Sequence, residues 1–141
     1  MPPVLEAARQ YIQRYGLEDR VGVRPGDFLT DDMGSGYDLV LLANVVHMYG
    51  AENSSALIKK SAAALASGGR IIIHGFCVDG DGTGPMEDVL FNLNIGMLTD
   101  AGRAHPVEEI TGWLERAGIS RVRHFRIEGH TTGVVTGAKV L

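Results

Sequence analysis

Residues 37–52 read YDLVLLANVVHMYGAE. The part at 38–46, DLVLLANVV, is almost wholly apolar and long enough to form a strand that is buried on both faces. Such strands are typical of parallel sheets covered by helices. A histidine, His47, follows the strand directly. The first question the sequence raises is therefore what a histidine does at the end of a buried strand.

Helical and strand patterns alternate on both sides of this stretch, which is the sequence mark of βαβ units. They predict an α/β fold with a mostly parallel sheet. In chain order, we expect a helix over 2–16, strands over 20–24 and 38–46, a helix from 53–55 to Gly68 and Gly69, a strand over 70–76, helices over 86–99 and 106–117, and an antiparallel hairpin over 120–141.

Composition limits the classes of protein that fit. The chain has 141 residues, of which 45% are hydrophobic and 21% are charged, so we expect one globular domain over residues 1–141. A net charge of -4 with scattered basic residues gives no surface for nucleic acid or for an anionic membrane. The single cysteine, Cys77, excludes an intramolecular disulfide, and we expect a cytoplasmic protein that binds a small molecule or another protein.

An ordered series of motifs resembles one known family, the class I S-adenosylmethionine-dependent O-methyltransferases of small hydroxylated aromatics in secondary metabolism. The motifs are GLEDRV at 16–21, GDF at 26–28, YDLVLLANVVH at 37–47, LASGGRIIIH at 65–74, WLERAGI at 113–119, and the closing hairpin. The resemblance implies a Rossmann-like methyltransferase sheet. It also implies transfer of a methyl group to the hydroxyl of a small aromatic metabolite.

The resemblance implies that His47 is the general base of this reaction. A neutral imidazole can take the proton of a phenol as its oxygen attacks the sulfonium methyl group. Met48 and Tyr49 stand where the family usually has an acidic residue and a tryptophan, Ala43 where many relatives have a basic residue, and residues 104–106 read Ala-His-Pro in place of Glu-Arg-Thr. The alternative is that His47 only caps the strand end and bonds to backbone.

The resemblance also implies residues that hold the cofactor, S-adenosylmethionine. Asp27 would accept a hydrogen bond from the adenine amino group, Phe28 would pack on the ring, and Asn44 would be a further contact. A carboxylate beside a flat apolar side chain is suited to an amino-purine. The alternative is that Asp27 caps a short turn running to residues 31–32, with Phe28 in the core.

The acceptor would be bound by residues near the base and on the helix at 86–99. By resemblance these are Met48, Phe91, Asn94 and Met97. A plain core helix is the alternative. The five histidines lack the spacing of metal ligands on one element, so we expect no metal site.

The family's glycine-rich cofactor loop and its first two strands have no counterpart among these residues. We therefore expect the chain to be the carboxy-terminal part of the catalytic domain and to bind S-adenosylmethionine weakly by itself. Two hypotheses stay open: an O-methyltransferase catalytic fragment, or a non-catalytic module that self-associates. In both, strand 38–46 would have an open, apolar edge, which favours a homo-oligomer.

Overall fold

The computed structural model describes residues 2–140. The chain divides at the Asp32–Met33 boundary into two compact units. The expectation of a single domain over residues 1–141 stays a prediction.

The first unit consists of a helix and irregular chain. Helix α1 spans Pro2–Arg14, and Gly16, with a φ of 60°, ends it in the left-handed conformation that glycine adopts without strain. The strand predicted over 20–24 is wrong, because this stretch is irregular. The N–H of Val21 is already donated to the carbonyl of Leu17 at 2.8 Å, and a short strand needs a hydrogen-bonded neighbour to persist.

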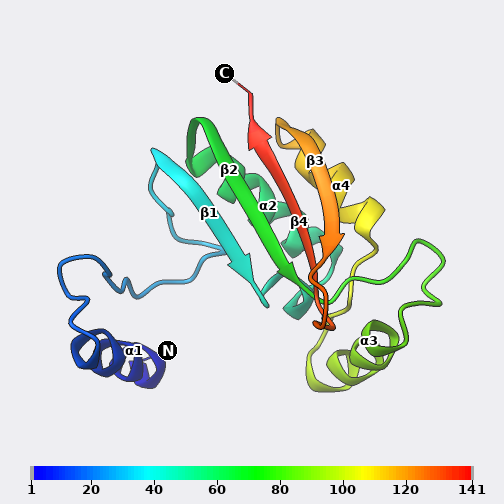
Figure 1. Cartoon of the computed structure of the whole chain (residues 1–141), viewed down its shortest axis with the longest axis horizontal. Helices are drawn as coiled ribbons and strands as arrows, with labels where there is room; N and C mark the ends of the chain where they lie inside the picture. Colours follow the sequence, from blue (N-terminus) through cyan, green and yellow to red (C-terminus); the bar gives the residue numbers. More distant parts are fainter. Residues whose placement is uncertain (1, 141) are drawn as a thin grey trace. The chain divides into compact units, whose positions relative to one another are not determined.

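The second unit is built on a four-stranded sheet in the order β1-β2-β4-β3 (Figure 1). Its strands are β1 Tyr37–Ala43, β2 Leu65–Gly75, β3 Ile119–Arg126 and β4 Gly133–Lys139. β1 pairs with β2 in parallel, whereas β4 pairs antiparallel with both β2 and β3. The predictions of an α/β fold and of a closing antiparallel hairpin are confirmed. The sheet was expected to be mostly parallel; among the described strands, the β1–β2 pairing is parallel and the two pairings of β4 are antiparallel.

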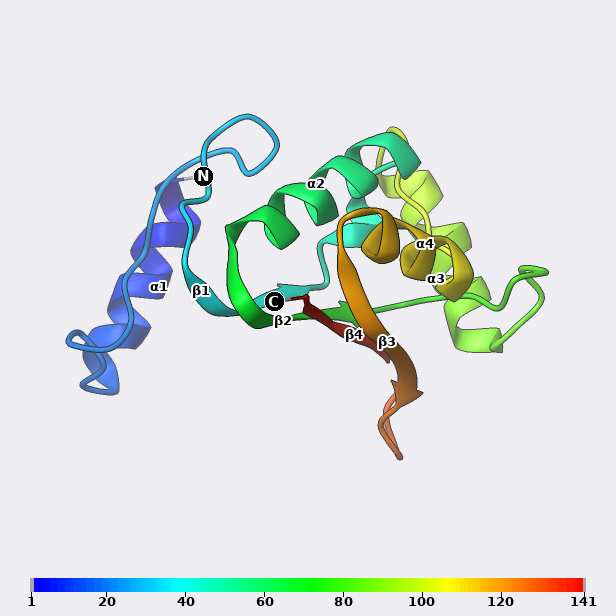
Figure 2. The same ribbon diagram turned by 90° about the horizontal axis from the view of Figure 1, so that it is seen from above.

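Helices α2 (Ala51–Ala64) and α4 (Val107–Arg116) lie on one face of this sheet, and α3 (Met86–Leu98) follows β2 (Figure 2). Together, the sheet and the two covering helices bury the core of the unit. Its most deeply buried side chains are Leu57, Ile58, Ile71, Ile73, Ile110, Leu114 and Val135. The alternation along β2 places Ile71 and Ile73 under the helices, while Arg70 and Ile72 point to the opposite face.

α2 begins earlier than the sequence predicts. Residues 53–55 carry the side chains that usually cap a helix, but the N-cap is Gly50 in an extended conformation. Its carbonyl accepts the N–H of Ser54 at 3.0 Å. Ser54 therefore lies inside the first turn, where its hydroxyl is free to bond elsewhere.

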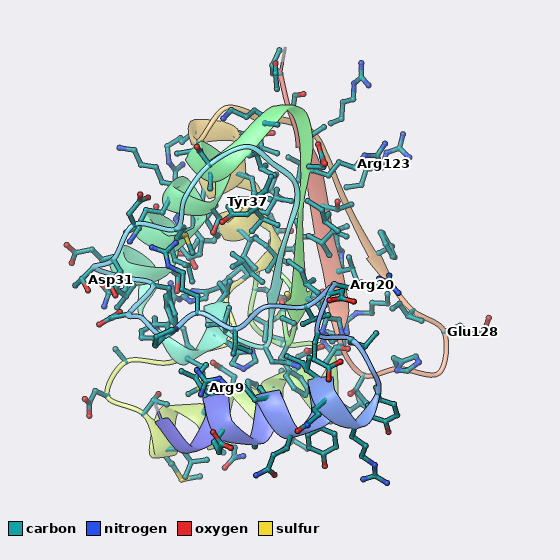
Figure 3. All side chains as sticks on the ribbon, turned by 90° about the vertical axis from the view of Figure 1, so that its left-hand side faces the viewer. Arg9, Arg20, Asp31, Tyr37, Arg123 and Glu128 are labelled. Atoms are coloured by element: carbon teal, nitrogen blue, oxygen red, sulfur yellow. The ribbon has the colours of Figure 1, made fainter. Side chains whose placement is uncertain are left out.

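The opposite face of the sheet exposes a mixture of apolar and basic side chains. Leu39 and Leu41 of β1 are 53% and 57% exposed, so the expectation of a strand buried on both faces is wrong: within Tyr37–Ala43, Leu42 is the buried residue. Arg123 projects from β3 away from the helices (Figure 3). Among the described residues, β1 pairs only with β2, so its other edge is open.

The first prediction concerns the core. Leu114, on α4, is 0% exposed, whereas Leu93, on α3, is 68% exposed. Leu114→Ala should lower the free energy of unfolding by about 2–5 kcal/mol, because it leaves a cavity against the sheet. Leu93→Ala, the same chemical change on a helix surface, should cost less than about 0.5 kcal/mol. Urea denaturation measures both, and equal losses would show that α4 does not cover the core.

Candidate active site

The carboxyl ends of β1 and β2 meet at the candidate site. The N–H of Asn44 donates to the carbonyl of His74 at 2.8 Å, which continues the parallel pairing one residue past β1. Asn44 has a φ of 53°, a left-handed conformation that asparagine tolerates better than most residues. The chain then turns into a 3₁₀ helix, η1, over Val46–Met48. The strand predicted to run to residue 46 therefore ends at Ala43, and His47 lies on the turn that follows it.

The imidazole of His47 is held by aromatic packing. His47 is 6% exposed, and its ring meets Phe91 edge-on with centroids 4.6 Å apart. Phe91 in turn stacks on Phe76, with centroids 3.8 Å apart. The ring contacts of His47 are therefore aromatic, and both its role as a base and the alternative that it only caps the strand end stay predictions.

Gly75, the last residue of β2, is the reason the ring can lie where it does. A Cβ at this position would come within 3.2 Å of His47 Nδ1, which is tighter than ordinary van der Waals contact. A larger residue would press on the imidazole unless the turn moved.

Burial lowers the pKa of His47 below that of an exposed histidine, and the charge of His105 acts in the same direction. The ring is therefore neutral at pH 7. A neutral imidazole has a lone pair with which it can accept a proton. The arrangement has the protonation state that general base catalysis requires.

The residues predicted to bind the acceptor differ in their surroundings. Phe91 is half-buried against His47, and Met48, on η1 beside it, is 40% exposed. Asn94 is exposed and Met97 is 75% exposed, so α3 is not a plain core helix. The structure brings Phe91 to His47, and the acceptor-binding role of all four residues stays a prediction.

The residues predicted to bind the cofactor's adenine lie in the first unit. Asp27 is exposed, its Oδ1 accepts the N–H of Leu29 at 2.9 Å, and its own N–H donates to Asp31 Oδ2 at 2.9 Å. Asp27 thus caps a turn, as the alternative predicted. A carboxylate has room for further donors, so the turn and an adenine contact are compatible. Phe28 is half-buried. The adenine roles of Asp27 and Phe28, and a cofactor contact at the exposed Asn44 of the second unit, stay predictions.

The sequence analysis missed a second buried histidine close to the same turn. His105 is 1% exposed and contacts Ser54, Tyr49 and Glu109. Only the i,i+4 spacing of His105 and Glu109 could have indicated part of this cluster. Its link to Ser54 joins residues that are 51 positions apart in the chain.

Three further observations concern cavities, metal ligands and membrane-spanning helices in the described part of the chain. A hollow of about 490 Å³ lies on the open face of the sheet, and none of the predicted site residues lines it. Over residues 2–140, no cluster of three or more His, Cys, Asp or Glu side chains is placed to hold a metal ion. Every helix in the same range is too short or too polar to cross a membrane.

Comparison with known proteins places this geometry in a family. The sequence model of the O-methyltransferase domain family matches residues 1–120. The 3-hydroxy-5-methyl-1-naphthoate 3-O-methyltransferase of Streptomyces sahachiroi is 33% identical over 99% of this chain and 40% of its own length. The L-tyrosine C(3)-methyltransferase of Streptomyces lavendulae is 34% identical over 91% of this chain and 35% of its own length.

Solved structures agree with the sequence comparison. An O-methyltransferase family 2 protein from Planctomyces limnophilus, in complex with apigenin, superposes with a TM-score of 0.89 and is 32% identical. The match covers 99% of this chain and 42% of that one. This chain thus spans about 40% of the length of the proteins it resembles. It belongs to the O-methyltransferase family and corresponds to the carboxy-terminal part of its catalytic domain.

Proposed function

We propose that this chain is the acceptor-activating part of an S-adenosylmethionine-dependent O-methyltransferase, and that it methylates a hydroxyl of a small aromatic metabolite. The observation that carries the proposal is the buried imidazole of His47, which packs against aromatic rings where the carboxyl ends of β1 and β2 meet. Burial lowers its pKa, which favours the neutral form that a base needs. Reacting groups in open α/β sheets gather at this edge. We also propose a cytoplasmic location, since the single cysteine is a buried free thiol.

In this mechanism His47 accepts the proton of the acceptor's hydroxyl at a ring nitrogen. S-adenosylmethionine, when bound, supplies an electrophilic methyl group on a sulfonium. Phe91 and Phe76 exclude water from one side of the imidazole and offer a flat apolar surface for an aromatic acceptor. Asp27 would accept the adenine amino group, and Phe28 and Asn44 would contact the cofactor. The remaining contribution is alignment of oxygen, methyl carbon and sulfur.

A second candidate function is a non-catalytic module that associates with copies of itself. The open edge of β1, together with Leu39 and Leu41 on its exposed face, favours this function. Unpaired edges of apolar strands are templates for pairing with another chain. Self-association by itself does not separate the two candidates, because β1 ends at Ala43, before His47; methyl transfer by the protein would exclude the non-catalytic one.

The second prediction concerns cofactor affinity. Calorimetric titration of this chain with S-adenosylmethionine and S-adenosylhomocysteine should give a dissociation constant weaker than about 100 μM. The candidate residues Asp27 and Phe28 hold only the adenine, and each charged hydrogen bond that is missing elsewhere costs about 1.5–3 kcal/mol. Asp27→Ala should abolish whatever binding remains. A low micromolar constant for the unaltered chain would contradict the assignment.

The third prediction concerns the base. In any form of the protein that transfers methyl groups, this chain or a longer one carrying it, His47→Ala should lower turnover by about 10²- to 10⁴-fold. Cofactor affinity should stay nearly unchanged, and high pH should restore part of the rate because a phenolic acceptor then ionises unaided. His130→Ala, at an exposed histidine between β3 and β4, is the matched control. An undiminished rate in His47→Ala at neutral pH would remove His47 from the mechanism.

The fourth prediction concerns assembly. Sedimentation velocity should show a homo-oligomer that the double change Leu39→Lys with Leu41→Lys dissociates, because two ammonium groups on β1 oppose burial of this strand. The control is Leu90→Lys with Leu93→Lys on α3, where the side chains are 59% and 68% exposed. A clean monomer at high concentration, or dissociation by the α3 pair alone, would rule out β1 as the interface.

A further inference from the structure

We propose that Ser54 and His105 form a buried hydrogen-bonded relay that holds the turn carrying His47, and that Glu109 extends the relay when His105 takes a second proton. His105 is then a positioning residue for the candidate base. The significance of the relay for catalysis rests on the proposed function of His47. Its existence rests on the contacts alone.

The relay forms hydrogen bonds to the backbone on both sides of His47. The hydroxyl of Ser54 donates to the carbonyl of Val46 at 2.9 Å, one residue before the histidine. On the other side, His105 Nε2 lies 2.9 Å from the carbonyl of Tyr49. Ser54 Oγ and His105 Nε2 are themselves 3.1 Å apart, and both residues are almost completely buried. The first turn of α2 and the segment before α4 thus fix the two ends of η1.

The connectivity of serine, histidine and glutamate resembles a hydrolytic triad, but its chemistry differs. A nucleophilic serine must present its oxygen to a substrate and give its proton to the histidine. Ser54 is 0% exposed, and its hydroxyl donates to the Val46 carbonyl. The serine therefore joins parts of the fold and does not attack a substrate.

The partners of His105 fix where its protons lie. The carbonyl of Tyr49 can only accept, so Nε2 carries a hydrogen, toward which the Ser54 oxygen also turns a lone pair. Nδ1 lies 3.2 Å from Glu109 Oε2, and both oxygens of that carboxylate accept from Arg103 Nη2, at 2.8 and 2.7 Å. A second proton, on Nδ1, would complete a chain of hydrogen bonds from η1 to the Arg103–Glu109 ion pair.

Two opposing effects set how readily His105 takes that second proton. Burial lowers the pKa of His105, and the guanidinium of Arg103 adds to this, whereas the Tyr49 carbonyl and Glu109 oppose it. The charge that His105 gains also lowers the pKa of His47, whose main cause of lowering is burial. The two imidazoles are therefore coupled: a proton on the relay disfavours a proton on the base.

The test uses the whole chain labelled with ¹⁵N, and two-bond ¹H–¹⁵N spectra of its histidine rings from about pH 5 to about pH 9. The relay predicts that neutral His105 is the Nε2–H tautomer. His105→Gln keeps an N–H for Tyr49 but cannot be charged, so the proton affinity of His47 should rise about two- to tenfold. Ser54→Ala should weaken the nuclear Overhauser contact between the rings of His47 and Phe91. His124→Gln, at an exposed histidine of β3, should change neither reading.

If Ser54 and His105 serve stability alone, their variants should have a lower melting temperature, while the titration of His47 and its contact with Phe91 stay unchanged. That result would overturn the relay. Should His105→Gln not fold, Glu109→Gln alters a side chain that is 28% exposed. His105 should then take its second proton at lower pH, and an unmoved titration would overturn the relay. None of these readings needs cofactor or acceptor, so the relay can fail while methyl transfer stands, and the reverse.

Discussion

The parallel pairing of β1 with β2 is the constraint on which the candidate site depends. It sets Leu41 beside Ile72 and Ala43 beside His74, and the bond from the Asn44 N–H to the His74 carbonyl extends it to the edge of the sheet. Because both strands end there, the turn after β1 and the loop after β2 leave the sheet at one place. His47 from the first and Phe76 from the second are thereby brought near each other, with ring centroids 6.0 Å apart. A slip of β1 by one residue against β2 would turn Leu42 out of the core.

Much of this could be predicted from the sequence, because hydrophobic periodicity reports burial directly. The apolar run at 38–46 predicted the edge strand β1, the run RIIIHGF predicted the central strand β2, and the helix predicted over 106–117 is α4. Hydrophobic periodicity failed to predict secondary structure where contacts with other parts of the chain decide it. The alternating residues 20–24 have the pattern of a strand, but without a partner in their own unit they stay irregular. Similarly, Asn53 to Ser55 look like helix caps, while a glycine with no side chain starts α2.

The sequence singled out His47 but not the residues that surround it, and the role of His47 as a general base stays a prediction. The position of His47 after an apolar strand, together with the family resemblance, singled it out. The contacts that hold it come from α3, from the end of β2 and from the segment before α4, which are distant in sequence. Residues 104–106 could be seen only as a departure from the family's usual Glu-Arg-Thr. In the structure, the histidine among them fills a buried position between Ser54 and Glu109, so that the departure has a structural use.

The surroundings of His47 also bear on which hydroxyl it could activate. The pKa of His47 lies below 6.5. Moving a proton from the acceptor's hydroxyl to this imidazole costs about 1.36 kcal/mol for each unit by which the hydroxyl's pKa exceeds that of the imidazole. For a phenol with a pKa near 10, this cost of proton transfer is a moderate part of the activation free energy of an enzyme reaction. A hydroxyl as weakly acidic as water would add several more kcal/mol to the cost for a phenol. No carboxylate contacts His47 in the described part of the chain to raise its basicity and offset that cost. Under the proposed function, the aromatic wall of Phe76 and Phe91 and the low basicity of the imidazole would favour the same acceptor, an aromatic ring that carries its hydroxyl directly.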